Sequence, residues 1–93
     1  MIHVRLDKRI YSLDVVNSAA YRLIPDASCH IEMEIESYLC RLTLKDPNGD
    51  AEMTRGRFLD FLNDERLRER LEEQTHQMRN LIVSLAFGAL ASE

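Results

Sequence analysis

The last third of the chain constrains the fold most, because Leu67 to Leu90 reads as one long helix. Mostly apolar residues recur there at steps of three and four, and no proline interrupts the run. From Leu81 to Ala91 only Ser84 and Gly88 are not apolar, so the helix changes from amphipathic to apolar on nearly all sides. A helix of that kind needs cover on more than one side. We therefore expect a partner surface here, supplied by a second copy of the chain or by a different protein.

The composition indicates a small globular protein. The 93 residues allow one domain with a modest core, and 45% hydrophobic with 30% charged residues is far from the composition of disordered chains. A net charge of −4, with basic and acidic residues interleaved, disfavours nucleic-acid binding. The N-terminal MIHVRLDKRIYS lacks the apolar core of a signal peptide, and the longest apolar run is too short to span a membrane. We expect a cytoplasmic protein whose two cysteines are reduced.

The N-terminal quarter predicts a strand followed by a helix. Residues 2–7 alternate between apolar and polar side chains, which is the pattern of a half-buried strand. Ser12 then precedes an apolar stripe of helical period, and its hydroxyl can cap the first turn. Pro25 disfavours helical geometry at Ile24, so we expect the helix to cover residues 13–23.

Two further strands are predicted by alternation on either side of Ser37. Their apolar residues are Ile31, Met33 and Ile35 in one strand and Cys40, Leu42 and Leu44 in the other. A turn at Ser37-Tyr38 would pair them, with a longer loop of the same parity as the alternative. That register sets Ile35 opposite Cys40 on the apolar face. On the polar face it sets Glu34 opposite Arg41.

The rest of the chain predicts two helical regions. Asp46 to Asp50 is rich in turn formers and ends the third strand. Asn63-Asp64 is interpreted as a break at which Asp64 caps the long helix, with one bent helix as the alternative. We expect one α+β domain over residues 1–93: a small three-stranded antiparallel-type sheet, an N-terminal crossover helix and a long C-terminal helical region, with the helices over the apolar face of the sheet.

The residues that could carry chemistry do not form a recognisable motif. The candidate metal ligands are His3, Cys29, His30, Cys40 and His76, and they include no close pair such as CxxC or HxxxH. A cysteine–histidine nucleophile pair has no positive support. The acidic row Glu32, Glu34 and Glu36 could serve acid/base chemistry or bind a cation, but it is also typical of a solvated strand face. No glycine-rich phosphate loop is present. We therefore expect no catalytic, metal-binding or cofactor-binding residue, and no enzyme.

The candidate partner-binding residues lie in the terminal apolar helix. They are Arg79, Leu81, Ile82, Leu85, Phe87 and Leu90. Burial against another surface accounts best for so large an apolar patch, so partner contact is favoured over packing within the chain. The sequence does not decide whether Tyr21 and Tyr38 are core residues or contact residues.

Three stretches of the chain carry a resemblance to a known family. They are VRLDKRIYSLDVVNSAAYRL (Val4 to Leu23), LRERLEEQT (Leu67 to Thr75) and RNLIVSLAF (Arg79 to Phe87). Together with the strand pair between them, they resemble the HxsD family, the small D component of the His-Xaa-Ser system. The resemblance implies a bacterial system in which two radical S-adenosylmethionine (radical SAM) proteins accompany a precursor peptide with His-Xaa-Ser repeats. It therefore implies a part in RiPP maturation, the making of a ribosomally synthesised, modified peptide.

Within such a system the resemblance implies an accessory. The chain lacks the CxxxCxxC motif of a radical SAM enzyme and the repeats of the precursor. It is thus expected to be a non-catalytic protein that binds a radical SAM enzyme, the precursor peptide, or both. The face of Leu81 to Leu90 could dock on the enzyme, and an exposed strand edge could capture the peptide as a further strand. The alternative is a self-associating protein, a homodimer through its C-terminal helices.

Overall fold

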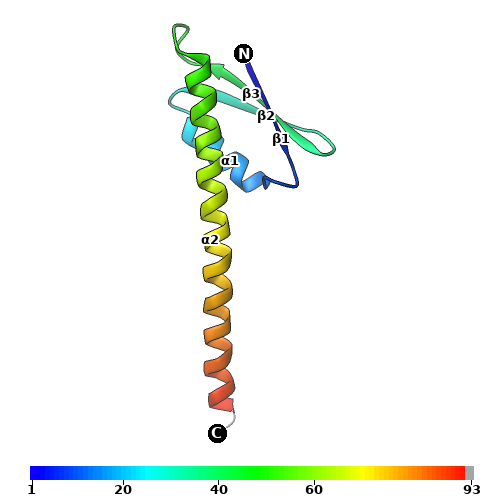
Figure 1. The fold of residues 1–93 in the computed structure, drawn as a ribbon, viewed down its shortest axis with the longest axis vertical. Helices are drawn as coiled ribbons and strands as arrows, with labels where there is room; N and C mark the ends of the chain where they lie inside the picture. The colour runs from blue at the N-terminus through cyan, green and yellow to red at the C-terminus, as the bar shows by residue number, and fades with distance from the viewer. Residues whose placement is uncertain (92–93) are drawn as a thin grey trace.

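The computed structural model describes the backbone of residues 1–91 and the side chains of residues 1–75. The elements in chain order are β1 (Ile2–Asp7), α1 (Leu13–Leu23), β2 (Ala27–Met33), β3 (Ser37–Leu44) and α2 (Ala51–Ala91). The strands form an antiparallel sheet in the order β1-β3-β2, and α1 connects its two edge strands (Figure 1). The predicted α+β fold, with its three-stranded sheet, crossover helix and long C-terminal helix, is confirmed.

The core lies between one face of the sheet and the two helices. Its largest fully buried side chains are Val16 and Leu23 of α1, Cys40 and Leu42 of β3, and Phe58 and Leu62 of α2. Phe58 and Leu62 lie one helical turn apart, so the same face of α2 meets the sheet and α1. The position of Cys40 confirms that it acts as a small apolar residue in the core.

α1 begins and ends where the sequence signals predict. The Ser12 hydroxyl accepts a hydrogen bond from the Val15 amide at 3.2 Å, which satisfies a free donor of the first turn. At the other end the Ile24 amide donates to the Tyr21 carbonyl at 3.2 Å. Pro25 follows at once, and the helix stops at Leu23.

β2 begins earlier than the alternation of large apolar residues suggests. Ala27 and Cys29 take inward positions on the strand, so Cys29 lies within β2 rather than before it. α1 contacts this strand, and small side chains suit the space beneath a helix. A search for large apolar residues therefore missed the first half of the strand.

The predicted hairpin register is wrong, because the turn lies two residues earlier than predicted. Ile31, rather than Ile35, lies opposite Cys40, because the turn falls at Ile35-Glu36. Ile35 is 95% exposed, whereas Tyr38 takes an inward position and is only 6% exposed. The shift thus buries a large aromatic ring in place of an aliphatic side chain. Apart from Ile35, the division into apolar and polar faces is nevertheless the predicted one, because the turn moved by an even number of residues.

α2 runs without interruption, so the predicted break at Asn63-Asp64 is wrong and the alternative of one helix is right. The cap is Asp50, whose carboxylate accepts hydrogen bonds from the amides of Glu52 at 3.0 Å and Met53 at 3.2 Å. Asp64 lies inside the helix. Its side chain serves tertiary ion pairing rather than capping.

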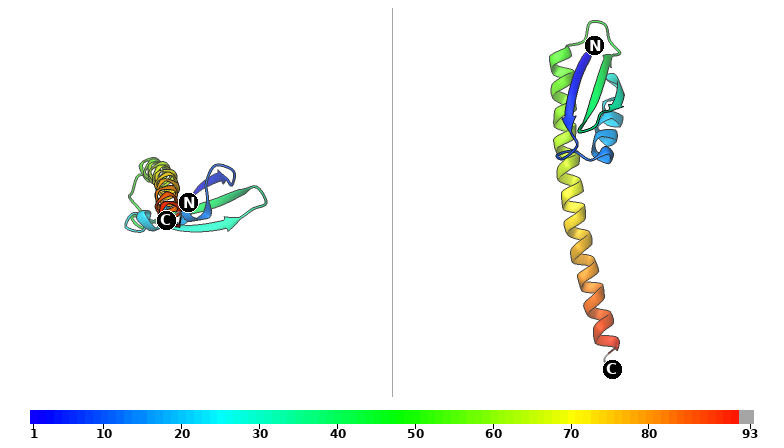
Figure 2. Two further views of the ribbon diagram at one scale, coloured as in Figure 1. Left: turned by 90° about the horizontal axis from the view of Figure 1, so that it is seen from below. Right: turned by 90° about the vertical axis from the view of Figure 1, so that its right-hand side faces the viewer.

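α2 is much longer than the body against which it packs. At 1.5 Å per residue a helix of this size is roughly 60 Å long, and the molecule measures 69 × 28 × 14 Å. The second half of the helix leaves the sheet and α1 behind (Figures 1 and 2). The chain therefore consists of a compact body, made by β1 to β3, α1 and the first half of α2, and a projecting helix.

Candidate partner-binding surfaces

Polar contacts as well as the core fasten the first half of α2 to α1. Arg22 donates to Asp64 at 2.7 Å and to Glu65 at 3.1 Å. Its guanidinium also lies over the ring of Phe61, 4.4 Å from the centroid. The hydrogen bond from Arg22 lowers the pKa of Asp64 below its ordinary value. These contacts set the position of α2 on α1.

The last described polar contacts between α2 and the rest of the chain are made with Tyr11 and Ser12, at the start of α1. The Ser12 hydroxyl donates to the Glu69 carboxylate at 2.7 Å, and the Arg66 guanidinium lies over the Tyr11 ring, 5.2 Å from its centroid. Ser12 therefore has two roles, as the cap of α1 and as a tie to α2. Among residues whose side chains the structure describes, Glu69 is the last on α2 to hydrogen-bond to another element.

The part of α2 beyond Glu69, residues 70–91, is called the stalk. Every side chain from Arg70 to Thr75 is exposed. Leu67 and Leu71, which begin the apolar stripe, are 57% and 53% exposed. The predicted partner-binding residues belong to the helical backbone of the stalk, but their side chains lie outside the described residues: Arg79, Leu81, Ile82, Leu85, Phe87 and Leu90. Their contact with a partner stays a prediction.

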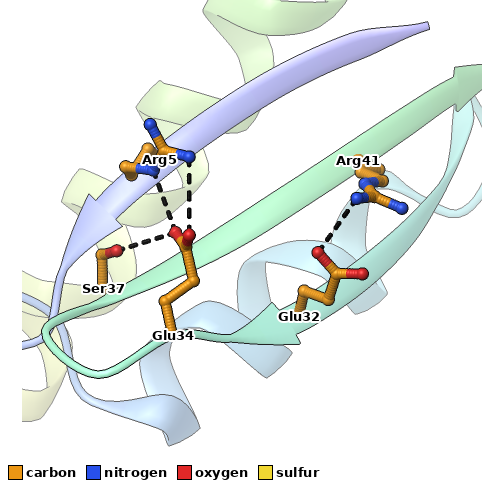
Figure 3. Close-up of polar contacts among 5 residues, drawn as sticks. All are labelled: Arg5, Glu32, Glu34, Ser37 and Arg41. Carbon is orange, nitrogen blue, oxygen red and sulfur yellow. Dashed lines mark hydrogen bonds and ion pairs between the residues drawn. The ribbon is translucent and has the colours of Figure 1, made fainter.

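Two members of the acidic row, Glu32 and Glu34, form ion pairs with arginines on the outer face of the sheet (Figure 3). Glu34 accepts hydrogen bonds from Arg5 at 2.9 Å and from the Ser37 hydroxyl at 2.9 Å, and these bonds lower its pKa. Arg41 pairs with Glu32 at 3.0 Å, so the predicted pairing of Glu34 with Arg41 is wrong. The displaced turn puts Glu34 at the end of β2, where Arg5 reaches it from β1. The row is thus part of a mixed, solvated charge network.

The cysteines and histidines are divided between the two faces of the sheet. Cys29 and Cys40 lie on the inner face of adjacent strands, and the hydrogen-bonding neighbour Cys29 together with burial raises the pKa of the Cys40 thiol. His3 and His30 are exposed on the outer face. No three potential metal ligands come together among the residues with described side chains, a set that excludes His76.

The sequence reasoning did not find a cleft of about 420 Å³ that opens where the α1–β2 connection meets the start of α2. Its walls include Asp26, Lys45, Met53 and Arg57, and Arg57 pairs with Asp26 at 2.9 Å. No spacing in the sequence links residues so far apart in the chain. Because acidic and basic side chains are mixed in its walls, the cleft offers no strong attraction to a ligand of one sign.

A second feature that the sequence reasoning missed is apolar exposure on α1. Leu13 and Ile24 are 40% and 47% exposed, and Tyr21 is 76% exposed. Of the two tyrosines left open, Tyr38 is thus a core residue and Tyr21 a surface residue. Leu13, Ala20 and Ile24 follow one another at steps of seven and four, which puts them on one flank of the helix. That spacing was the available signal.

Comparison with known proteins assigns the chain to a family. No helix that the structure describes has the length and apolar character needed to cross a membrane. No curated protein and no solved structure matched the chain. The family model described as His-Xaa-Ser system protein HxsD matched residues 6–93, from within β1 to the last residue. Because this match spans nearly the whole sequence, as the three resembling stretches led us to expect, the chain belongs to the HxsD family of the His-Xaa-Ser system.

Proposed function

We propose that this protein is a non-catalytic accessory of a His-Xaa-Ser peptide maturation system. Its stalk docks on a radical SAM enzyme of the system, and its body brings the precursor peptide to that enzyme. The projection of the stalk from the body is the observation that carries the proposal. The compact part of the chain needs α2 only as far as Glu69, which leaves a long helical segment for another protein.

The stability of helices supports a bound partner for the stalk. An isolated helix of this length is marginal in water, and most helices in proteins are stabilised by packing an apolar face. The described part of the stalk has no such packing, since all side chains from Arg70 to Thr75 are exposed. The stripe that begins at Leu67 and Leu71 continues in sequence into the nearly all-apolar segment from Leu81 to Ala91. A groove or helix on an enzyme would cover this surface.

The charge pairing on the sheet supports an accessory rather than a catalyst. A catalytic carboxylate needs a pKa and a position suited to proton transfer, usually in a pocket. Glu32 and Glu34 instead lie on an open strand face, where each pairs with an arginine. Lowering of the pKa of Glu34 keeps that carboxylate ionised and makes it a poorer base.

Co-purification tests the docking step. The tagged chain is co-expressed with each radical SAM enzyme of the system, as the full chain, as Leu85→Asp and as a truncation that ends at Met78. We expect the full chain to retain an enzyme and both stalk variants to lose it, because a charge or a deletion removes the apolar surface. Met53→Asp is the matched control, since it places the same charge at an exposed site on the same helix. It should retain the enzyme.

The fold of each variant is checked by urea unfolding of the purified chain. Loss of capture with an unchanged unfolding midpoint supports docking through the stalk. Equal loss of capture and of fold in Leu85→Asp would instead make Leu85 a core residue and contradict the proposal. Failure of the full chain to retain any enzyme, together with a dimer whose mass in gel filtration persists on dilution, would favour the self-associating alternative.

A further inference from the structure

The free side of β2 exposes backbone groups that no described residue satisfies. In an antiparallel ladder, hydrogen-bonded pairs alternate with pairs that are not bonded to each other. The amide of Glu34 donates to the carbonyl of Ser37 at 2.9 Å, which fixes the phase of the β2–β3 ladder. By this alternation, the amides and carbonyls of Cys29, Ile31 and Met33 point away from β3. They form the outer edge of the sheet, because β3 is the strand that pairs with β2.

The other edge of the sheet, on β1, differs in its side chains. The amide of Lys8 donates to the carbonyl of Glu36 at 3.0 Å, so the free backbone groups of β1 are those of its outward-facing residues, such as His3. Its inward side chains Val4 and Leu6 are each only 4% exposed, because they belong to the core to which α2 contributes. A strand added at β1 would therefore find little apolar surface left to bury.

Apolar surface remains exposed along β2. Ile31 and Cys29 are only partly buried, and Met33 is 59% exposed. All three side chains point to the inner face of the sheet. They continue the apolar surface of the core to the free edge of β2, where no other part of the described chain covers it fully. An added strand at β2 would satisfy backbone groups and bury apolar side chains together.

The flank of α1 next to this edge is also largely apolar, with the exposed Asn17 between Leu13 and Ala20. α2 contacts β1 and α1 contacts β2, and one view of Figure 2 shows these two pairs on opposite sides of the body. On α1, Arg22 faces α2, while Leu13, Ala20 and Ile24 lie about 160–180° around the helix from it. This flank lies on the side of α1 away from α2, which is the side of the free β2 edge. The inner side chains of β2 and this flank of α1 together form an exposed apolar surface next to the unpaired backbone groups of β2.

We infer that the β2 edge binds an extended segment of a peptide as a fourth strand, with apolar side chains at every second position of the segment. These side chains would cover Ile31, Met33 and the α1 flank. The inference rests on the proposed function, in which the precursor peptide is the partner of the body. A seven-residue strand with three flank residues supplies far fewer than the roughly 20–30 residues per side of a standard protein–protein interface. The edge therefore suits a peptide better than a second folded copy.

Amide hydrogen exchange tests the site directly. The probes are short synthetic peptides that tile the precursor, added to the full chain. Without peptide, the edge amides of Cys29, Ile31 and Met33 exchange fast, since they have no partner. With a binding peptide, we expect their exchange to slow while that of His3 on the β1 edge stays fast. Binding that protects the β1 edge, or neither edge, would overturn the inference.

A pair of proline variants tests the backbone contribution. Ile31→Pro removes an amide that faces the free edge, a change that edge strands tolerate, and His3→Pro makes the same change at the other edge. We expect Ile31→Pro to weaken peptide binding in fluorescence anisotropy by about tenfold or more, and His3→Pro to leave it within about twofold. Met33→Glu tests the apolar contribution of the edge, because it places a charge at an exposed apolar site of β2. It should also weaken peptide binding, and it does not depend on whether the strand tolerates a proline. Equal effects of the two proline variants would contradict the site.

Two outcomes separate this inference from the proposed function. If Ile31→Pro loses the peptide and still retains the enzyme, both stand, because edge and stalk act independently. If the full chain retains the enzyme while no peptide protects β2, the inference fails and the docking function stands. Protection of β2 that grows with protein concentration in the absence of peptide would assign the edge to a second copy, and would overturn the inference.

Discussion

Two identical substitutions on α2 test where the body ends. Leu62 is fully buried and Leu71 is 53% exposed, although both lie on the same helix. Leu62→Ala removes core atoms and leaves a cavity, which costs about 2–5 kcal/mol in comparable sites. Leu71→Ala removes atoms that contact mostly solvent, so we expect a change of about 0.5 kcal/mol or less. A chain of this length has a free energy of unfolding of roughly 5–14 kcal/mol, so only Leu62→Ala removes a large part of it.

Urea unfolding monitored by tyrosine fluorescence measures this difference. The chain has no tryptophan, and the buried ring of Tyr38 reports on the body. The measurement is repeated at two protein concentrations, because a dimer through the stalk would make the midpoint depend on concentration. If Leu71→Ala costs as much as Leu62→Ala at both concentrations, the stalk packs on its own body. The reasoning that it is free for a partner would then be refuted.

Three further predictions concern pH, thiol chemistry and the hairpin. Arg22 lowers the pKa of Asp64 below 3.8, so the stability from this pair is present above that pH and is lost as pH falls through the folded value. The urea midpoints of Arg22→Gln and the parent should therefore differ at neutral pH and converge in acid; a constant difference would contradict this. Iodoacetamide should label half-buried Cys29 before fully buried Cys40, as mass spectrometry of digests would show, and equal rates would argue against the fold. Ile35→Lys should leave the urea midpoint unchanged, because the side chain is 95% exposed. A large decrease in the midpoint would support the register predicted from the sequence, in which Ile35 lies opposite Cys40.

Features set by neighbouring residues could be predicted from the sequence. β1 follows from alternation over residues 2–7, and α1 follows from the Ser12 cap and Pro25. The end of β3 follows from the turn formers after Leu44. Each of these signals acts within a few residues, so no knowledge of tertiary contacts is needed to interpret it.

Features decided by tertiary contacts could not be predicted. The polar pair Asn63-Asp64 has the local character of a helix start, but the ion pair with Arg22 of α1 accommodates Asp64 inside a continuous helix. The hairpin register depends on which side chains the core buries, and it buries Tyr38 while Ile35 lies exposed in the turn. The small Ala27, fully buried at the start of β2, gave no hydrophobic signal of its own. The free edge at β2 likewise depends on strand order, which alternation leaves open.

The order of the strands in the sheet has a consequence for how the protein is made. β3 is the last strand in the sequence, yet it occupies the middle of the sheet, and β1 and β2 pair only with it. A nascent chain that has emerged as far as Met33 therefore contains the residues of β1 and β2 but not β3, the strand with which both form hydrogen bonds. The hydrophobic core is complete only after Phe58 and Leu62 follow, roughly 1.5–6 s later at 5–20 residues per second. The stalk emerges after that, so the helix proposed to bind a partner leaves the ribosome when the residues of the body are already available to fold.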